Sequence, residues 1–300
     1  MLLERYLATQ LARSYRGSVA KIMSPDAVRG LAVLNQLVFT STALLQKGLP
    51  HVSQFFAVQD QTFATKQNAL QISGSLCSKS RKPLLRAIRQ AAQEAGLSLR
   101  EIETEQLGVH GLVGKLDRSW YVLGDDVVMQ AEGVELGATS QALMQQLELT
   151  GKRLYFLAQR GPKRLMAIIA CGTELDPHAV DAVHRLRALG LEVSLLSEER
   201  ERIVQGLCQS AEITQWRSEL TPAGKHQVAE QFIQEQPRGG FLCRPADVEL
   251  VPEPSLITVI GRPQPQASVS IAELGELVDE IERARTLMQQ AAKVFFWRKI

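Results

Sequence analysis

The sequence lacks the long apolar runs that mark membrane-spanning and exported chains. Nowhere in its 300 residues do about 18 apolar residues follow one another, which is the length that a membrane-spanning helix requires. The first residues also lack the apolar core of a signal peptide. These absences predict a cytoplasmic chain without a transmembrane segment.

Cysteine is also scarce. The four cysteines are far apart and include no Cys-x-x-Cys pair, which argues against a zinc knuckle and against a disulfide framework. The five histidines are scattered as well. His178 and His184 lie on one predicted helix at a spacing that does not bring them to one face. We therefore expect no metal site.

A strong charge of either sign is missing too. The formal net charge is +2, and 22% of the residues are charged. So small a balance gives no reason to expect a nucleic-acid partner. With 45% hydrophobic residues, the chain has the composition of a globular protein with a substantial core.

The sequence does contain strand and helix patterns that alternate after Gly151. Asp176-Pro177 predicts the start of one helix, with Asp as its N-cap, and Gly190 predicts its end. Thr221-Pro222 predicts the start of a second helix. Strands are predicted over residues 154–158, 165–170, 191–196, 240–243 and 256–260. This alternation is typical of a parallel sheet with helices on its faces.

Residues 51–150 carry separate signals. Pro83 predicts a helix start and Gly96 its end, and strands are predicted over 97–102 and 120–123. At the two ends of the chain, amphipathic helices are predicted over residues 2–16 and 271–297.

One motif suggests an ancestry. Residues 37–48 read LVFTSTALLQKG, which resembles the phosphorylation segment VVFDKTGTLTxG of P-type ATPases. Thr40 stands where the phosphorylated aspartate is expected, Ser41 replaces the lysine, and Thr42 is retained. Residues 172–190 resemble a second stretch of that family, DxxRPEAxxAIxxLKxxG. The chain is most similar to the heavy-metal-transporting branch.

The resemblance implies an α/β fold: a haloacid-dehalogenase-like, doubly wound parallel sheet with an inserted α+β domain. It places residues 1–50 and 151–270 in a discontinuous phosphorylation-domain-like core. Residues 51–150 would form a nucleotide-binding-domain-like insert, and residues 271–300 a C-terminal amphipathic helix.

The resemblance also implies further site residues. Ser197 stands at the start of the family's TGD motif, and Lys225 matches the lysine of PEDK. Asp247 matches the second aspartate of GDGxND, whereas Cys243 replaces the first. The relic catalytic positions are therefore Ser197, Lys225 and Asp247, together with Thr40 and Thr42 of the phosphorylation segment.

Cofactors are not expected from this set. Thr40 and Cys243 replace carboxylates that Mg²⁺ would need, and Arg244 lies beside them. In the insert, the family's SEHP and GxGV motifs read SRKP and QLGV. Lys82, Pro83 and Gly108 are the positions that a nucleotide would use, but the changes around them disfavour ATP.

The leading hypothesis is a catalytically degenerate pseudoenzyme that acts as a binding or regulatory partner of a membrane transporter or a metal-homeostasis assembly. Its partners would be proteins, a membrane protein among the candidates, and it would lie in the cytoplasm or at the membrane periphery. One alternative is a residual ATPase or phosphatase that uses Thr40, Ser197, Lys225 and Asp247. A second alternative is a nucleotide or anion sensor without catalysis.

Overall fold

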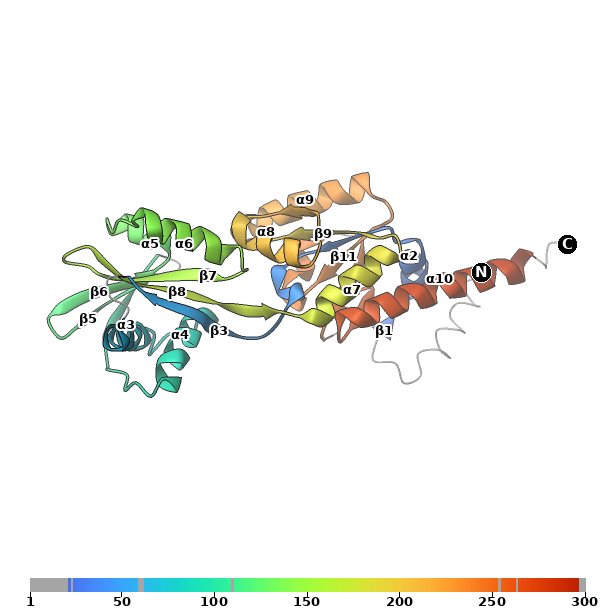
Figure 1. Ribbon diagram of the computed structural model, residues 1–300. Coiled ribbons are helices and arrows are strands. Elements are labelled where there is room, and N and C mark those ends of the chain that lie inside the picture. The colour runs from blue at the N-terminus through green and yellow to red at the C-terminus, as the bar shows by residue number, and fades with distance from the viewer. Residues whose placement is uncertain are drawn as a thin grey trace. The chain divides into compact units, whose positions relative to one another are not determined.

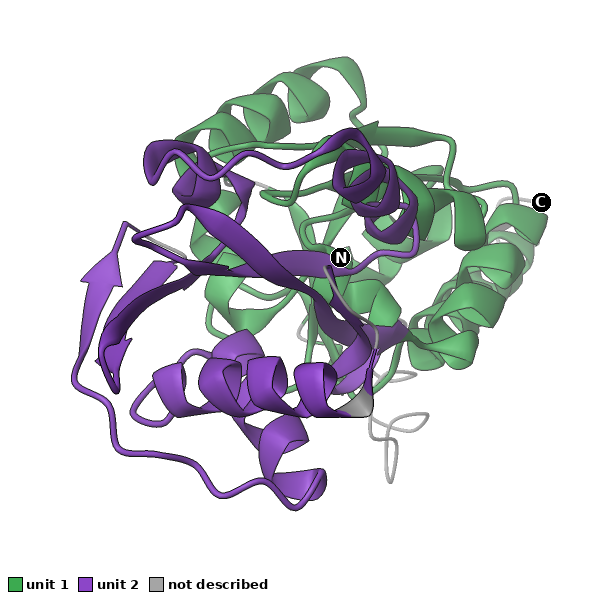
Figure 2. Ribbon diagram, turned by 60° about the vertical axis from the view of Figure 1, so that its left-hand side comes forward, with its two compact units in different colours: residues 1–46, 175–300 green, residues 47–174 purple. Residues whose placement is uncertain are grey.

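The computed structural model (Figure 1) describes residues 21–22, 24–58, 62–108, 111–252, 255–262 and 264–296. The helix predicted over residues 2–16 lies outside the described residues. The chain forms two compact units. Unit 1 comprises Met1–Gln46 and Leu175–Ile300, and unit 2 comprises Lys47–Glu174 (Figure 2).

Unit 1 is built on a seven-stranded sheet in the order β1-β13-β12-β11-β2-β9-β10. Neighbouring strands are parallel, except that β1 runs antiparallel to β13. The strands are β1 (Lys21–Ile22), β2 (Gln36–Phe39), β9 (Glu192–Leu196), β10 (Gln215–Arg217), β11 (Gly239–Cys243), β12 (Leu256–Ile260) and β13 (Val269–Ile271).

Helices cover both faces of this sheet, because the central strand β2 is apolar on both sides. Leu37 and Phe39 pack in a core with α2, α7, α8 and α10, whereas Val38 packs in a second core with α9 and η2. The bounds are α2 (Pro25–Val33), η1 (Thr42–Leu45), α7 (Pro177–Ala188), α8 (Glu201–Ser210), α9 (Pro222–Glu235), η2 (Pro245–Leu250) and α10 (Leu274–Phe296). This is the doubly wound α/β arrangement that the sequence predicts.

Local signals set the ends of α7 as expected. The side chain of Asp176 accepts a hydrogen bond from the backbone N–H of His178 at 3.0 Å, and Pro177 is the first helical residue. Gly190 follows the helix with φ of 81°, a conformation that glycine adopts without a steric penalty.

Unit 2 contains a six-stranded sheet in the order β3-β8-β7-β6-β5-β4. The pairs from β8 to β4 are antiparallel. Helices α3 and α4 cover one face and α5 and α6 the other (Figure 1). The bounds are β3 (Gln46–Ala57), α3 (Phe63–Leu76), α4 (Pro83–Glu94), β4 (Thr104–Leu107), β5 (Gly111–Leu116), β6 (Ser119–Gly124), α5 (Asp126–Ala131), α6 (Ala138–Glu148), β7 (Arg153–Gln159) and β8 (Arg164–Leu175).

Three boundaries differ from the sequence predictions. The insert extends past residue 150, because β7 and β8 pair with β6 in the sheet of unit 2. Residues 97–102 form no strand: the N–H of Arg100 donates to the hydroxyl of Ser75 in α3 at 3.0 Å, so this backbone is tied to a helix. Ile271 ends a strand rather than starting α10, because it pairs with Ile260.

Candidate functional site

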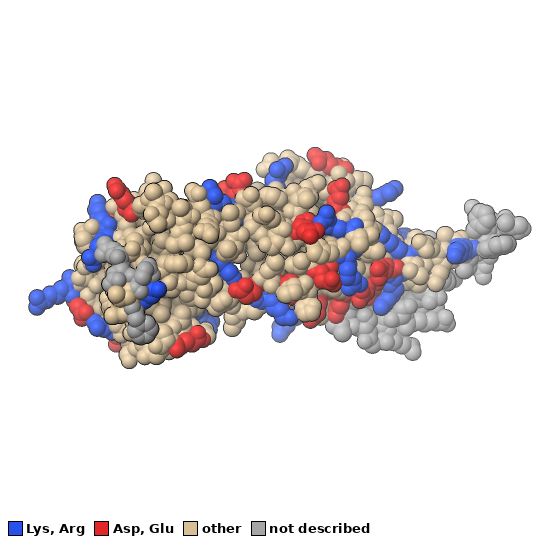
Figure 3. All heavy atoms as spheres, viewed as in Figure 1, with Lys and Arg blue, Asp and Glu red and all other residues tan. Residues whose placement is uncertain are grey.

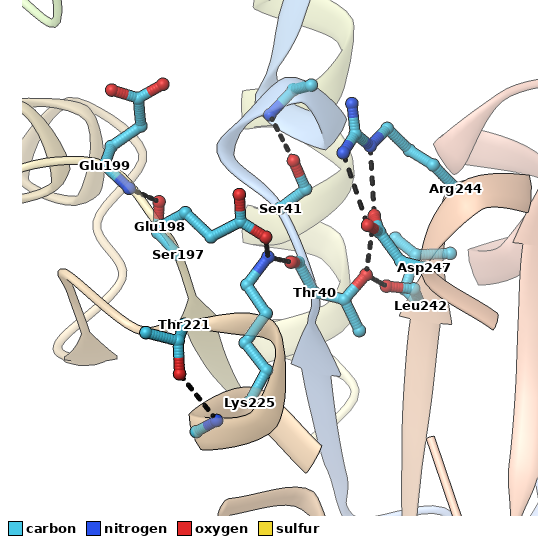
Figure 4. Close-up of polar contacts among 12 residues, drawn as sticks. Thr40, Ser41, Ser197, Glu198, Glu199, Thr221, Lys225, Leu242, Arg244 and Asp247 are labelled. Carbon is cyan, nitrogen blue, oxygen red and sulfur yellow. Dashed lines mark hydrogen bonds and ion pairs between the residues drawn. The ribbon is translucent and has the colours of Figure 1, made fainter. Parts of the chain in front are cut away.

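The predicted site residues of unit 1 gather at one edge of its sheet. The carboxyl ends of β2, β9 and β11 adjoin there, because these strands are parallel and neighbouring or next-neighbouring. Thr40 follows β2, Ser197 follows β9, and Arg244 follows β11. In open α/β sheets this edge is where ligands bind. Figure 4 shows the side chains.

Thr40 is the centre of the group and is buried. Its N–H donates to the carbonyl of Leu242 at 3.0 Å. Its hydroxyl lies 3.3 Å from the same carbonyl and 3.2 Å from Oδ2 of Asp247. Since a hydroxyl has one proton, these two acceptors share it. Thr40, itself uncharged, therefore tethers β2 to β11 and η2 through hydrogen bonds to a carbonyl and a carboxylate.

Asp247 is bound on both of its oxygens. The guanidinium of Arg244 donates from Nε to Oδ2 at 3.0 Å and from Nη2 to Oδ1 at 3.3 Å. The side chain of Asp247 is only 6% exposed, whereas that of Arg244 is 44% exposed. Such a fork is a strong, orientation-specific pairing. It places a fixed positive charge against the one carboxylate that the relic motif retains.

Lys225 enters the same edge from the first turn of α9. Its ammonium donates to the backbone carbonyl of Thr40 at 2.9 Å and lies 3.2 Å from Oε1 of Glu198. The lysine side chain is 4% exposed and the glutamate is 55% exposed. Thr221 caps the helix by accepting from the N–H of Gly224 at 3.1 Å. The lysine charge is thus neutralised from the solvent side.

Ser197 and Thr42 make fewer hydrogen bonds within this cluster than Thr40, Lys225 and Asp247. The hydroxyl of Ser197 accepts from the N–H of Glu199 at 3.0 Å, which makes it part of a local turn. Thr42 lies in η1, whose N-cap is Ser41. Thr42 is buried, and no side-chain hydrogen bond joins it to the other site residues among the described part of the chain.

Cys243 lies in β11 where the family motif has its first aspartate. Burial raises the pKa of the Cys243 thiol to about 12, and the hydrogen bond with Thr40 lowers this pKa by a smaller amount. A neutral thiol gives no charge and no hard oxygen to this edge of the sheet.

These residues do not fit Mg²⁺. The ion takes hard oxygen ligands in octahedral geometry. Asp247 is the carboxylate retained at the motif positions and is already held by Arg244, and the nearby carboxylate of Glu198 is paired with Lys225. Within the described ranges, no group of three or more His, Cys, Asp or Glu side chains could hold a metal ion.

The nucleotide-like positions lie in unit 2. Lys82 precedes α4 and Pro83 is its first residue. Gly108 follows β4 with φ of 54°. The side-chain amide of Gln106 donates to the carbonyls of Gly108 at 2.9 Å and of Gly111 at 2.7 Å. Gln106, which replaces a family glycine, therefore braces the β4–β5 turn. Val109 of the same motif lies outside the described residues.

The sequence prediction included neither of the two ion pairs at this site, Arg244 with Asp247 and Lys225 with Glu198. The i, i+3 spacing of Arg244 and Asp247 was a usable signal, because a short helix brings such positions together. Glu198 and Lys225 meet only through the fold, and no spacing in the sequence indicates that pair.

Comparison with known proteins defines the class. The family model "haloacid dehalogenase-like hydrolase" matches residues 39–238. The chain belongs to this family.

Its relatives are heavy-metal P-type ATPases. It is 28% identical over 227 residues to a probable copper-transporting ATPase, PacS, of Synechococcus elongatus, covering 75% of this chain and 29% of that protein. It is 26% identical over 207 residues to a copper-exporting P-type ATPase of Staphylococcus aureus, covering 69% of this chain and 24% of that protein. The chain thus spans less than a third of these relatives.

Solved structures agree on the fold. A zinc-transporting PIB-type ATPase in the E2.Pi state matches with a TM-score of 0.75 and 19% identity, over 97% of this chain and 47% of that one. The catalytic domain of the CPx-ATPase CopB-B matches with a TM-score of 0.66 and 18% identity, over 94% of this chain and 99% of that one. The predicted fold and family resemblance are confirmed. Among the described residues, no helix has the length and apolar character to cross a bilayer.

Proposed function

We propose that this chain is a catalytically degenerate, P-type-ATPase-like pseudoenzyme that acts by binding a partner. The observation that carries the proposal is the hydrogen bond from Thr40 to Asp247, at 3.2 Å, with Asp247 held on both oxygens by Arg244. The position of the nucleophile is neutral, and the position that would bind a cation is already paired.

The chemistry of threonine supports the proposal. A carboxylate can form an acyl phosphate, which is a reactive covalent intermediate. A hydroxyl at position 40 could form only a phosphate monoester, and monoester hydrolysis is among the slowest uncatalysed reactions known. Lys225 is also turned to the Thr40 carbonyl and to Glu198 rather than left for a phosphate oxygen. The cluster therefore favours a structural role over turnover.

The proposed partner is a protein, and a membrane transporter or a metal-homeostasis assembly is the leading class. The support is kinship with copper-transporting ATPases. The proposed location is the cytoplasm or the membrane periphery. On the face drawn in Figure 3, acidic and basic side chains are interspersed, and the net charge is +2. Such a surface favours a protein partner over nucleic acid.

One observation favours a second candidate, a residual ATPase or phosphatase. Thr40 remains in direct contact with both Lys225 and Asp247. In that case Mg²⁺-dependent hydrolysis of ATP or of a phosphate ester should be measurable, and Thr40→Val should abolish it. Thr286→Val is the control, because Thr286 lies in α10 and its exposed hydroxyl donates to the carbonyl of Glu282 at 2.9 Å.

The pseudoenzyme proposal predicts the opposite result. Wild type, Thr40→Val and Lys225→Ala should all show the same background hydrolysis, and mass spectrometry after incubation with ATP should show no phosphoryl adduct. Turnover that disappears in Thr40→Val and persists in Thr286→Val would overturn the proposal. The sensor alternative, which would use Lys82, Pro83 and Gly108, requires ATP, ADP or AMP to bind in calorimetry at millimolar ligand.

The partner is tested separately. Crosslinking of the tagged chain in its native cells, followed by affinity capture from soluble and membrane fractions, should yield a stoichiometric protein partner. Recovery of the chain alone from both fractions would contradict the binding role.

A further inference from the structure

Unit 2 contains a cavity that the phosphorylation-like site does not explain. Its volume is about 500 Å³, within the range of small-molecule sites. It lies between α6 and strands β3 and β8, and its apolar wall comes from Phe56, Leu143, Leu165 and Ile168. These residues belong to the core that α5 and α6 form on one face of the sheet. Lys82 and Pro83 start α4, which packs on the opposite face.

The start of α6 borders this cavity. Gly137 is the N-cap and supplies no side-chain hydrogen bond. The first intrahelical bond runs from the N–H of Gln141 to the carbonyl of Gly137 at 3.0 Å. The N–H groups of Ala138, Thr139 and Ser140 precede it and have no acceptor in the helix. All three residues line the cavity, where the helix dipole favours a negative charge.

Ser140 gives an independent indication of a ligand. It is 8% exposed and lines the cavity, yet no described residue bonds its hydroxyl. Two other buried serines of this unit, Ser73 and Ser75, donate their hydroxyls to carbonyls four residues earlier, at 2.8 and 2.7 Å. The fully enclosed hydroxyls without a partner among the described residues are those of Ser78 and Ser270, not that of Ser140. The Ser140 hydroxyl therefore reaches the cavity that the residue lines, where a polar ligand group would bond it.

The charged groups at the rim are of both signs. Arg164 lines the cavity and donates to the neutral side chain of Gln159 at 2.9 Å, and no acidic side chain among the described residues forms an ion pair with it. Glu135 also lines the cavity and opposes an anion there. The nearby Arg160 is already paired with Glu132 at 2.6 Å. The start of α6, Ser140 and Arg164 together favour an anion in the cavity more than the exposed carboxylate of Glu135 disfavours it.

We propose that this cavity binds a small amphipathic carboxylate. The carboxylate would accept hydrogen bonds from the amides of residues 138–140, the hydroxyl of Ser140 and the guanidinium of Arg164. The hydrocarbon part would pack on Leu143, Leu165 and the other apolar wall residues. The proposal does not depend on the catalytic state of unit 1.

The test uses the full-length chain labelled with ¹⁵N, with sodium octanoate as the probe and 1-octanol as its uncharged counterpart. Octanoate should cause saturable shifts of the Ala138, Thr139 and Ser140 amide signals, and octanol should bind at least about tenfold more weakly. No saturable shift at up to about 10 mM octanoate, or equal binding of octanol, would overturn the proposal.

Variants separate the charge contributions. Arg164→Gln should weaken octanoate binding by about tenfold, and Ser140→Ala by about threefold. Glu135→Gln should strengthen it by about threefold, because it removes the opposing charge. The controls are Arg118→Gln and Glu105→Gln, which change exposed residues outside the cavity. Unchanged affinity in both Arg164→Gln and Glu135→Gln would overturn the proposed anion site.

Discussion

The ion pair of Arg244 and Asp247 is a two-point contact at the carboxyl edge of the unit 1 sheet. Its two hydrogen bonds measure 3.0 and 3.3 Å, and the aspartate side chain is 6% exposed. A carboxylate so buried must be paired, because removal from water otherwise disfavours its charge. Arg244 provides that pairing from three residues away.

We expect Arg244→Ala to lower the free energy of unfolding of unit 1 by about 1–3 kcal/mol, because it leaves a buried carboxylate without its partner. The value falls below that of fully buried pairs since Arg244 is 44% exposed. Urea unfolding, monitored by circular dichroism, measures this loss of free energy. The double variant Arg244→Ala/Asp247→Asn should recover at least half of the loss, and a wild-type midpoint for Arg244→Ala would contradict the expectation.

The four cysteines allow a second prediction at this scale. Burial raises the pKa of Cys171, Cys208 and Cys243 to about 12, and it raises that of Cys77 as well. Because the thiolate is the reactive form, folded protein at pH 8 should give less than about one reactive thiol per chain with Ellman's reagent. All four should react in guanidinium. Fast labelling of the folded chain at pH 8 would show that burial does not protect them.

At the scale of elements, α9 positions Lys225 in its first turn. Thr221 accepts from the N–H of Gly224 at 3.1 Å, and loss of such a cap costs about 1 kcal/mol. We expect Thr221→Ala to lower the free energy of unfolding by about that amount, whereas Thr221→Ser should retain most of the wild-type value. Urea midpoints of the two variants, compared side by side, check this; equal midpoints would show that the cap does not stabilise α9.

The start and end signals of helices were readable from the sequence, because each depends on neighbours in the chain. Asp176, Thr221 and Gly190 all act where they were predicted to. Strands 154–158 and 165–170 were also predicted, and they form β7 and β8, which pair with each other. Their sheet was assigned wrongly, since an apolar pattern does not specify which distant strand becomes the neighbour.

The same limit applies to the site. Thr40, Lys225 and Asp247 could be placed together because parallel strands end at a common edge and the family motif supplies the register. The ion pair between Lys225 and Glu198 could not, because it depends on how α9 packs against the loop after β9. The burial of all five relic residues (Thr40, Thr42, Ser197, Lys225 and Asp247) is likewise a finding of the structure and not of the sequence.

At the scale of the whole molecule, the chain enters and leaves unit 2 at one place on unit 1. The N–H of Asp176 donates to the carbonyl of Leu45 at 2.8 Å, so the two crossing points are adjacent. Each unit has its own apolar cores. This arrangement predicts that unit 2 can be removed from the chain without disrupting the core of unit 1.

We expect residues 47–174, expressed alone, to unfold cooperatively on heating. Unit 1 with that segment replaced by a short Gly-Ser linker should do the same, because the linker needs to span only adjacent backbone positions. Thermal melts by circular dichroism and dispersed amide spectra check both fragments. Aggregation or gradual melting of either one would show that it requires the other unit.

The Arg244–Asp247 pair also limits which side chains position 40 can accept. An aspartate introduced at position 40 would meet the Asp247 carboxylate where a hydroxyl now lies 3.2 Å away, and like charges that close repel. If Arg244 were lost first, Asp247 would be stranded without a partner. Each change is unfavourable when it is made alone, so a second acidic side chain at this edge of the sheet requires changes at both positions together.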